Sequence, residues 1–201
     1  MMGRRTQLTY DDFAALPDDG KHYELLAGVL YVNPSPGLPH QHTAKRAFLK
    51  ICEYFEGNGF AEVFFAPFDV ILSEHDVAEP DILVVAATAQ FSQRGVEGPP
   101  ALVVEVISPS SRKYDRVTKA ARYLALGVEH YWIIDPKAKH VLCQRAERGE
   151  WVVVAEGRDS DTVCDPSWPD LIITLKDLWR TRSGQSRTLR KSSLHTRFAR
   201  I

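Results

Sequence analysis

Residues 101–107 read Ala-Leu-Val-Val-Glu-Val-Ile, an apolar strand pattern with a single carboxylate, Glu105, near its centre. An ionised carboxylate is costly to remove from water, so Glu105 at this position needs a partner such as a cation or a base. A second carboxylate, Asp81, follows Pro80 and opens another apolar strand, predicted over residues 82–86. Neighbouring strands lie about 4.8 Å apart, so the two carboxylates can meet over one cation that prefers oxygen ligands. The pair suggests a metal site.

The segment that follows predicts a change from strand to helix. Residues 108–111, Ser-Pro-Ser-Ser, break the strand and can cap a helix over residues 113–126, on which Asp115 and Lys119 stand four residues apart. A strand over residues 131–134 follows, and this strand-helix-strand unit predicts an α/β domain with a mixed central sheet. The other expected elements are a helix capped by Thr9 and running through Leu16, a hairpin over 23–32, a helix over 41–55, strands over 61–72, 141–145 and 151–155, and a short helix over 175–179.

Several short motifs occur in order along the chain. They are Pro80-Asp81, residues 104–111, Asp115 with Lys119, Tyr123, Gly127-Val128 and residues 131–136, preceded by residues 23–28, Ser35-Pro36 and His40-Gln41. In this order the motifs resemble the Uma-type endonuclease family, long catalogued as a domain of unknown function, which belongs to the PD-(D/E)XK nuclease superfamily. The resemblance covers residues 8–180 and implies a restriction-endonuclease-like α/β fold, in which helices flank a mixed central β-sheet.

The resemblance also implies roles for individual residues. Asp81, Glu105 and the backbone carbonyl of Val106 would hold a Mg²⁺ ion, with Mn²⁺ as a substitute. Lys119 would orient the attacking water or stabilise charge on the phosphate, and Glu24 would assist the metal site or bind a second ion. The implied catalytic residues are therefore Asp81, Glu105, Lys119 and Glu24.

The chain departs from the family pattern at two positions. The superfamily pattern has a Lys two residues after the second carboxylate, where this chain has Ile107. Lys119, on the predicted helix that follows, is interpreted as the migrated equivalent. Ala27 stands before Gly28, where relatives often carry an acid.

Each of these residues also has a structural interpretation. Asp81 can be a turn residue at the start of a strand, and Lys119 can be an exposed helix residue paired with Asp115. Glu24 can be an outward-facing hairpin carboxylate. His40 lies near a predicted helix start, where it can contact phosphate, act as a base or have no role in the site.

Composition favours one globular domain over residues 1–180. At 201 residues and 44% hydrophobic, the chain can bury one sizeable core. No stretch approaches the run of about 18 apolar residues typical of a membrane span, and the N-terminus lacks a secretory apolar region, so we expect a cytoplasmic protein. The three cysteines form no CxxC pair and are assigned no disulfide or zinc site.

Charge is distributed unevenly. From Arg180 onward the chain has seven Lys or Arg and no acid, and removing these seven from the total of 25 leaves 18 basic against 26 acidic residues, a formal charge of about −8. Residues 181–201 are predicted to be a disordered basic tail, which can neutralise phosphates. The alternative is a solvated extension without a role.

The leading functional hypothesis is a metal-dependent endonuclease that hydrolyses DNA phosphodiester bonds. DNA is the expected partner, and a homodimer is a further hypothesis because nucleases of this fold often cut both strands as dimers. One alternative is a non-cleaving module that binds nucleic acid or regulates other proteins on the same fold. Another alternative is metal-dependent hydrolysis of a small phosphorylated or other soluble substrate.

Overall fold

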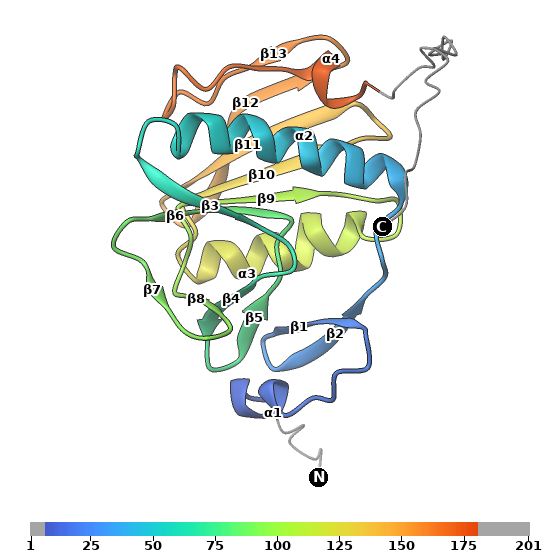
Figure 1. Ribbon diagram of the computed structural model, residues 1–201, viewed down its shortest axis with the longest axis vertical. Coiled ribbons are helices and arrows are strands. Elements are labelled where there is room, and N and C mark those ends of the chain that lie inside the picture. The colour runs from blue at the N-terminus through green and yellow to red at the C-terminus, as the bar shows by residue number, and fades with distance from the viewer. Residues whose placement is uncertain (1–6, 181–201) are drawn as a thin grey trace, which may run out of the picture.

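The strand that carries Glu105 lies inside a mixed six-stranded sheet, here called the central sheet (Figure 1). The computed structural model describes residues 7–180. The sheet order is β12 (Glu150–Arg158), β11 (His140–Glu147), β10 (His130–Asp135), β9 (Leu102–Val106), β6 (Ile82–Ala86) and β3 (Ala61–Phe65). β9 runs parallel to β10, and the other neighbouring pairs are antiparallel. The predicted α/β protein with a mixed central sheet is confirmed.

Helical segments cover opposite faces of the central sheet (Figure 1). Leu102 and Val104 of β9 join the core beneath one helix, α2, whereas Val103 joins the core beneath the segment formed by η1 and α3. Successive strand residues point to opposite faces, so Glu105 shares the face of Val103 and points toward η1 and α3. The helical bounds are α2 Leu38–Phe55, the π-helix η1 Tyr114–Lys119 and α3 Ala120–Ala125.

A second six-stranded sheet, here called the N-terminal sheet, was predicted only in its first hairpin. Its order is β2 (Val29–Asn33), β1 (His22–Leu26), β5 (Asp76–Ala78), β4 (Asp69–Ser73), β8 (Gly95–Glu97) and β7 (Gln90–Phe91). The predicted hairpin turn at Ala27-Gly28 is confirmed, with φ values of +52° and +73°. A Cβ atom at Gly28 would lie 2.5 Å from Cβ of Gln7, so this turn position requires glycine.

The prediction of one continuous strand over residues 61–72 is wrong. The segment forms β3 in the central sheet and β4 in the N-terminal sheet, on either side of Pro67. Proline has no backbone N–H and cannot continue the ladder, so the chain changes sheets there. The chain returns from β5 to β6 through Glu79 and Pro80, and this return places Asp81 at the junction of the two sheets.

The helix predicted over residues 113–126 is only partly α-helical, because its first part is the π-helix η1. The helix predicted from residue 41 begins earlier, at Leu38, with Pro39 in its first turn, where proline is tolerated. Tyr131 and Trp132 of β10 are buried core residues. The remaining elements are α1 (Tyr10–Ala14), capped by Thr9, the pair β13 (Thr162–Val163) and β14 (Ile173–Thr174), and α4 (Leu175–Leu178).

Among residues 7–180, no helix is both long enough and apolar enough to cross a membrane. The predicted basic tail, residues 181–201, lies outside the described residues.

Asp76 ties the N-terminal sheet to α3. Its carboxylate is fully buried and accepts hydrogen bonds from the backbone of Ala27 and the hydroxyl of Ser73, at 2.8 and 2.7 Å. Arg122 of α3 donates to it through two guanidinium nitrogens. Burial opposes the charged form of Asp76, but the hydrogen bonds from Arg122, Ala27 and Ser73 and the charge of Arg122 together outweigh burial and hold the pKa of Asp76 below its usual value.

We expect Asp76→Asn to lower the free energy of unfolding at pH 7 by about 2–3 kcal/mol, because charge-assisted hydrogen bonds are lost. A carboxylate whose pKa is lowered on folding stabilises the protein above its unfolded pKa of about 3.9, and this contribution disappears as the pH falls through the folded pKa. The difference between wild type and variant, measured by urea unfolding, should therefore shrink below about pH 5. A difference that stays constant down to acidic pH would contradict this account.

Candidate active site

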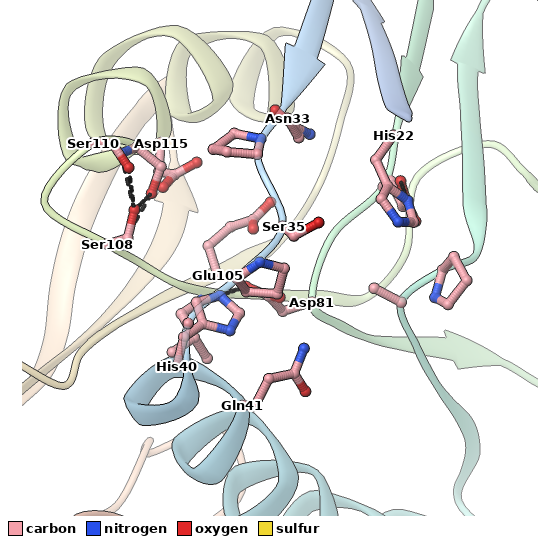
Figure 2. Close-up of a pocket in the computed structure, with 18 of the residues that line it drawn as sticks. His22, Asn33, Ser35, His40, Gln41, Asp81, Glu105, Ser108, Ser110 and Asp115 are labelled. Carbon is pink, nitrogen blue, oxygen red and sulfur yellow. Dashed lines mark hydrogen bonds and ion pairs between the residues drawn. The ribbon is translucent and has the colours of Figure 1, made fainter. Parts of the chain in front are cut away.

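A pocket of about 320 Å³ opens where β9 ends. Its walls come from the first turn of α2, the start of β6, the loop after β9 and the π-helix η1. Figure 2 shows Asp81, Glu105 and His40 close together in this pocket, with Asp115 on the opposite wall. The structure thus brings together Asp81, Glu105 and Lys119, three residues that the sequence places on separate elements.

Lys119 lies at the centre of a buried ionic cluster. Its Nζ is 2.8 Å from Oε1 of Glu105, 2.9 Å from Oε1 of Glu24 and 3.9 Å from Oδ1 of Asp115. Only 4% of the Lys119 side chain is exposed, so the alternative of an exposed lysine paired with Asp115 alone is wrong. The amine is held against the pocket by carboxylates from three different elements.

Lys119 and Asp115 both lie on the π-helix η1. The N–H of Ala120 donates to the carbonyl of Asp115, five residues earlier. π-helical turns are rare and often occur at functional sites. Asp115, Lys119 and Tyr123 stand four residues apart, and all three are buried. This spacing of polar residues was the only sequence signal for the inward face of the helix, and nothing in the sequence indicated its π-turn.

Glu24 is also buried, with no exposed surface, so the alternative that it is an outward-facing hairpin carboxylate is wrong. Its Oε2 accepts hydrogen bonds from Asn33 Nδ2 at 2.7 Å and from the Tyr114 hydroxyl at 3.1 Å. Its Oε1 accepts from the Glu79 N–H at 2.8 Å and faces Lys119. Both oxygens of Glu24 are therefore occupied by donors of the protein itself.

Asp81 is held by two neighbours at one of its oxygens. Oδ2 accepts a hydrogen bond from the Val106 N–H at 2.8 Å and lies 3.2 Å from Nε2 of His40. Nδ1 of His40 is buried and has no hydrogen-bond partner among the described residues. The sequence indicated no partner for His40, and in the structure its partner is Asp81. This contact helps to fix the orientation of the Asp81 carboxylate.

Excess negative charge characterises this site. Burial raises the pKa of Glu105 well above its usual value and also raises the pKa of Asp115. Burial opposes the charged form of Lys119, but the surrounding acidic groups, first of all Glu105 and Glu24, together outweigh it and hold the lysine pKa well above its usual value. Asp81 adds a fourth carboxylate on the same pocket wall as Glu105. One ammonium ion cannot neutralise four carboxylates, so the site favours an added proton or cation.

The donor atoms fit a cation that keeps several of its own waters. Within residues 7–180, no group of three or more His, Cys, Asp or Glu side chains is arranged to hold a metal ion. Mg²⁺ needs fewer ligands from the protein, typically one or two carboxylates. The hydrogen bonds described above engage Oδ2 of Asp81 and Oε1 of Glu105, where the hydroxyl of Tyr123 also donates at 2.9 Å. The second oxygen of each carboxylate remains for a ligand.

Tyr123 had no assigned role in the sequence, and the structure makes it a direct partner of Glu105. We expect Tyr123→Phe to lower the free energy of unfolding by about 1–2 kcal/mol, because a buried acceptor loses its donor. Tyr131→Phe is a matched control, since its hydroxyl donates to the backbone carbonyl of Asp115 at 3.0 Å and not to Glu105. Urea unfolding should show losses for both variants, whereas any catalytic activity should fall only in Tyr123→Phe. Equal activity in the two variants would contradict a role for Tyr123 at Glu105.

The arrangement of the central sheet and its flanking helices also occurs in a solved structure. A solved structure with the same fold is the crystal structure of "a putative nuclease belonging to DUF820" from Anabaena variabilis ATCC 29413, with a TM-score of 0.70 and 22% sequence identity over 86% of this chain and 97% of that chain. Residues 10–185 match the Uma2 family, described as "putative restriction endonuclease", so the chain belongs to that family. The family resemblance and the fold expected from the sequence are confirmed. No curated protein matches the chain.

Proposed function

We propose that the protein is a Mg²⁺-dependent endonuclease that hydrolyses DNA phosphodiester bonds, with Mn²⁺ as a substitute ion. The observation that carries this proposal is the convergence of Asp81, Glu105 and buried Lys119 in one pocket of a chain of the Uma2 family. Asp81, Glu105 and the carbonyl of Val106 are the proposed metal ligands. A divalent ion bound there would neutralise charge on the phosphate and lower the pKa of a water molecule.

Other residues of the chain have proposed roles in binding and orientation. Lys119 can orient the attacking water or donate to a phosphate oxygen as negative charge develops on it. Glu24 positions Lys119, because its own oxygens are filled by Asn33, Tyr114 and the backbone of Glu79. His40 and the N–H of Val106 keep Asp81 in one orientation. Catalysis in such a site depends on preorganised charge.

The test of this proposal is a comparison of substrates. Purified protein is incubated with duplex DNA, single-stranded DNA, single-stranded RNA and bis(p-nitrophenyl) phosphate, each with Mg²⁺, Mn²⁺ or EDTA. The proposal predicts cleavage of duplex DNA with either ion and none in EDTA. Cleavage of the small phosphodiester alone would contradict the DNA assignment and favour a small soluble substrate.

The second candidate is a nucleic-acid-binding module that keeps the fold without cleaving. The buried ion pairs of Lys119 favour it in one respect, because they also stabilise a folded protein without any metal. A binding-only module should retain its DNA affinity in Asp81→Asn and Glu105→Gln and should show no nicking in any metal.

A homodimer is part of the nuclease proposal, and sedimentation in the presence of duplex DNA would test it.

A further inference from the structure

A second hollow, outside the candidate active site, lies among α4, the β10–β11 turn and the β12–β13 turn. It has a volume of about 350 Å³ and is lined by Lys139, Asp159, Ser160, Lys176, Trp179 and Arg180. The lining holds three cations and one carboxylate. We call this hollow the basic groove.

The charge of the basic groove is opposite to that of the surrounding protein. Eight of the 25 Lys and Arg residues lie outside residues 7–180, so the described part holds 17 basic residues against all 26 Asp and Glu. A cluster of cations on such a body concentrates positive potential in one place and attracts anions there. Six further Lys or Arg follow Arg180 in the sequence, without any acid.

The groove and the candidate active site lie at the same edge of the central sheet. β9 and β10 are parallel, with Val106 beside Ile134, so the turn after β10 that carries Lys139 is at the edge where the pocket opens. Figure 1 shows α4 and the start of α2 at this same side of the sheet. Arg46 of α2 donates to the carbonyl of Leu178 in α4 at 3.2 Å. Arg46 stands six residues after His40, or about 9 Å along the helix.

The side chains of the groove fit phosphate better than bases. Nε1 of Trp179 donates to the carbonyl of Asp159 at 2.8 Å, and the ring is partly buried, so it is not a free platform for unpaired bases. Lys139 and Lys176 supply mobile point charges, which bind phosphate without reading sequence. We propose that the basic groove binds the phosphate backbone of duplex DNA beside the cleavage pocket. This inference rests on the proposed function only in taking DNA as the ligand.

The test compares two variants matched in charge, Lys139→Ala/Lys176→Ala and Lys50→Ala/Arg148→Ala. Lys139 and Arg148 flank the same strand, β11, and have similar φ values of +47° and +52°, so alanine has the same backbone consequence at both positions. Lys50 and Lys176 are both exposed helix residues. Binding of a fluorescein-labelled duplex to the full chain is measured in EDTA over a series of KCl concentrations.

We expect the groove variant to bind the duplex about tenfold or more weakly at low salt and to show a salt slope reduced by about two, roughly one for each lost phosphate contact. The control variant should match the wild type. Identical slopes for wild type and groove variant would overturn the inference, as would a wild type that binds no duplex at any salt concentration. Cleavage in Mg²⁺ is scored separately: normal cleavage with unchanged slopes rejects the groove alone, and groove-dependent binding without cleavage rejects the nuclease alone.

Discussion

Asp81→Asn and Glu105→Gln are each expected to lower the rate of DNA cleavage by about 10³-fold or more. Each substitution keeps the shape of the side chain but replaces a negatively charged ligand oxygen by an amide. Because the two carboxylates are proposed to bind one ion, their effects should not add, and the double variant should be about as inactive as either single variant. Asp81 lies immediately before β6, and Glu105 lies in β9, the antiparallel neighbour of β6.

Cleavage rates of these variants are compared at saturating Mg²⁺, with folding checked by circular dichroism. Glu62→Gln provides the control, because Glu62 is an exposed residue of β3 in the same sheet. The control should cleave at the wild-type rate. Wild-type activity in either Asp81→Asn or Glu105→Gln would contradict the proposed metal ligands.

Lys119→Met is expected to abolish cleavage and also to lower the free energy of unfolding by about 3–5 kcal/mol at pH 7. Removal of the ammonium leaves Glu24, Glu105 and Asp115 buried without their shared counter-charge. Burial already raises the pKa values of Glu105 and Asp115, and loss of the ammonium should raise them further, so the folded state binds protons more readily than the unfolded state. The loss of stability should therefore become smaller as the pH is lowered from 7.

Urea unfolding at several pH values measures this effect. Lys113→Met is the matched control, since Lys113 is exposed and lies immediately before η1. Lys119→Arg should restore more stability than activity, because it keeps the charge but not the position of the amine. If Lys119→Met is as stable as the wild type and the difference in unfolding free energy does not change with pH, the three carboxylates do not need Lys119 as a counter-charge.

The sequence predicted most of the central sheet because several of its strands are long or largely apolar. Residues 102–106 and 130–135 are buried on both faces, and such strands have a strong local pattern. The N-terminal sheet escaped prediction beyond its first hairpin, and two of its strands, β7 and β8, have only two and three residues. Strands this short have no periodicity, and they form only because the tertiary structure pairs them.

The sequence predicted the charged residues of the candidate site but not the residues that they contact. Asp81, Glu105 and Lys119 came from short motifs. The contacts of Glu24 with Tyr114 and of Asp81 with His40 join residues far apart in the chain, which no local pattern indicates. From the sequence alone, Glu24 and Lys119 could each be buried or exposed, because burial of a charge depends on these distant partners.

Nicking of supercoiled plasmid DNA would show whether the protein is a nuclease that depends on Asp81 and Glu105. Wild type, Asp81→Asn, Glu105→Gln and Glu62→Gln are purified in parallel and incubated with Mg²⁺ or EDTA, and open-circular product is measured over time. Wild type and Glu62→Gln should nick the plasmid in the presence of Mg²⁺, and the two site variants should not. Nicking that persists at equal rate in Asp81→Asn and Glu105→Gln, or no nicking by any protein in Mg²⁺ or Mn²⁺, would contradict this proposal.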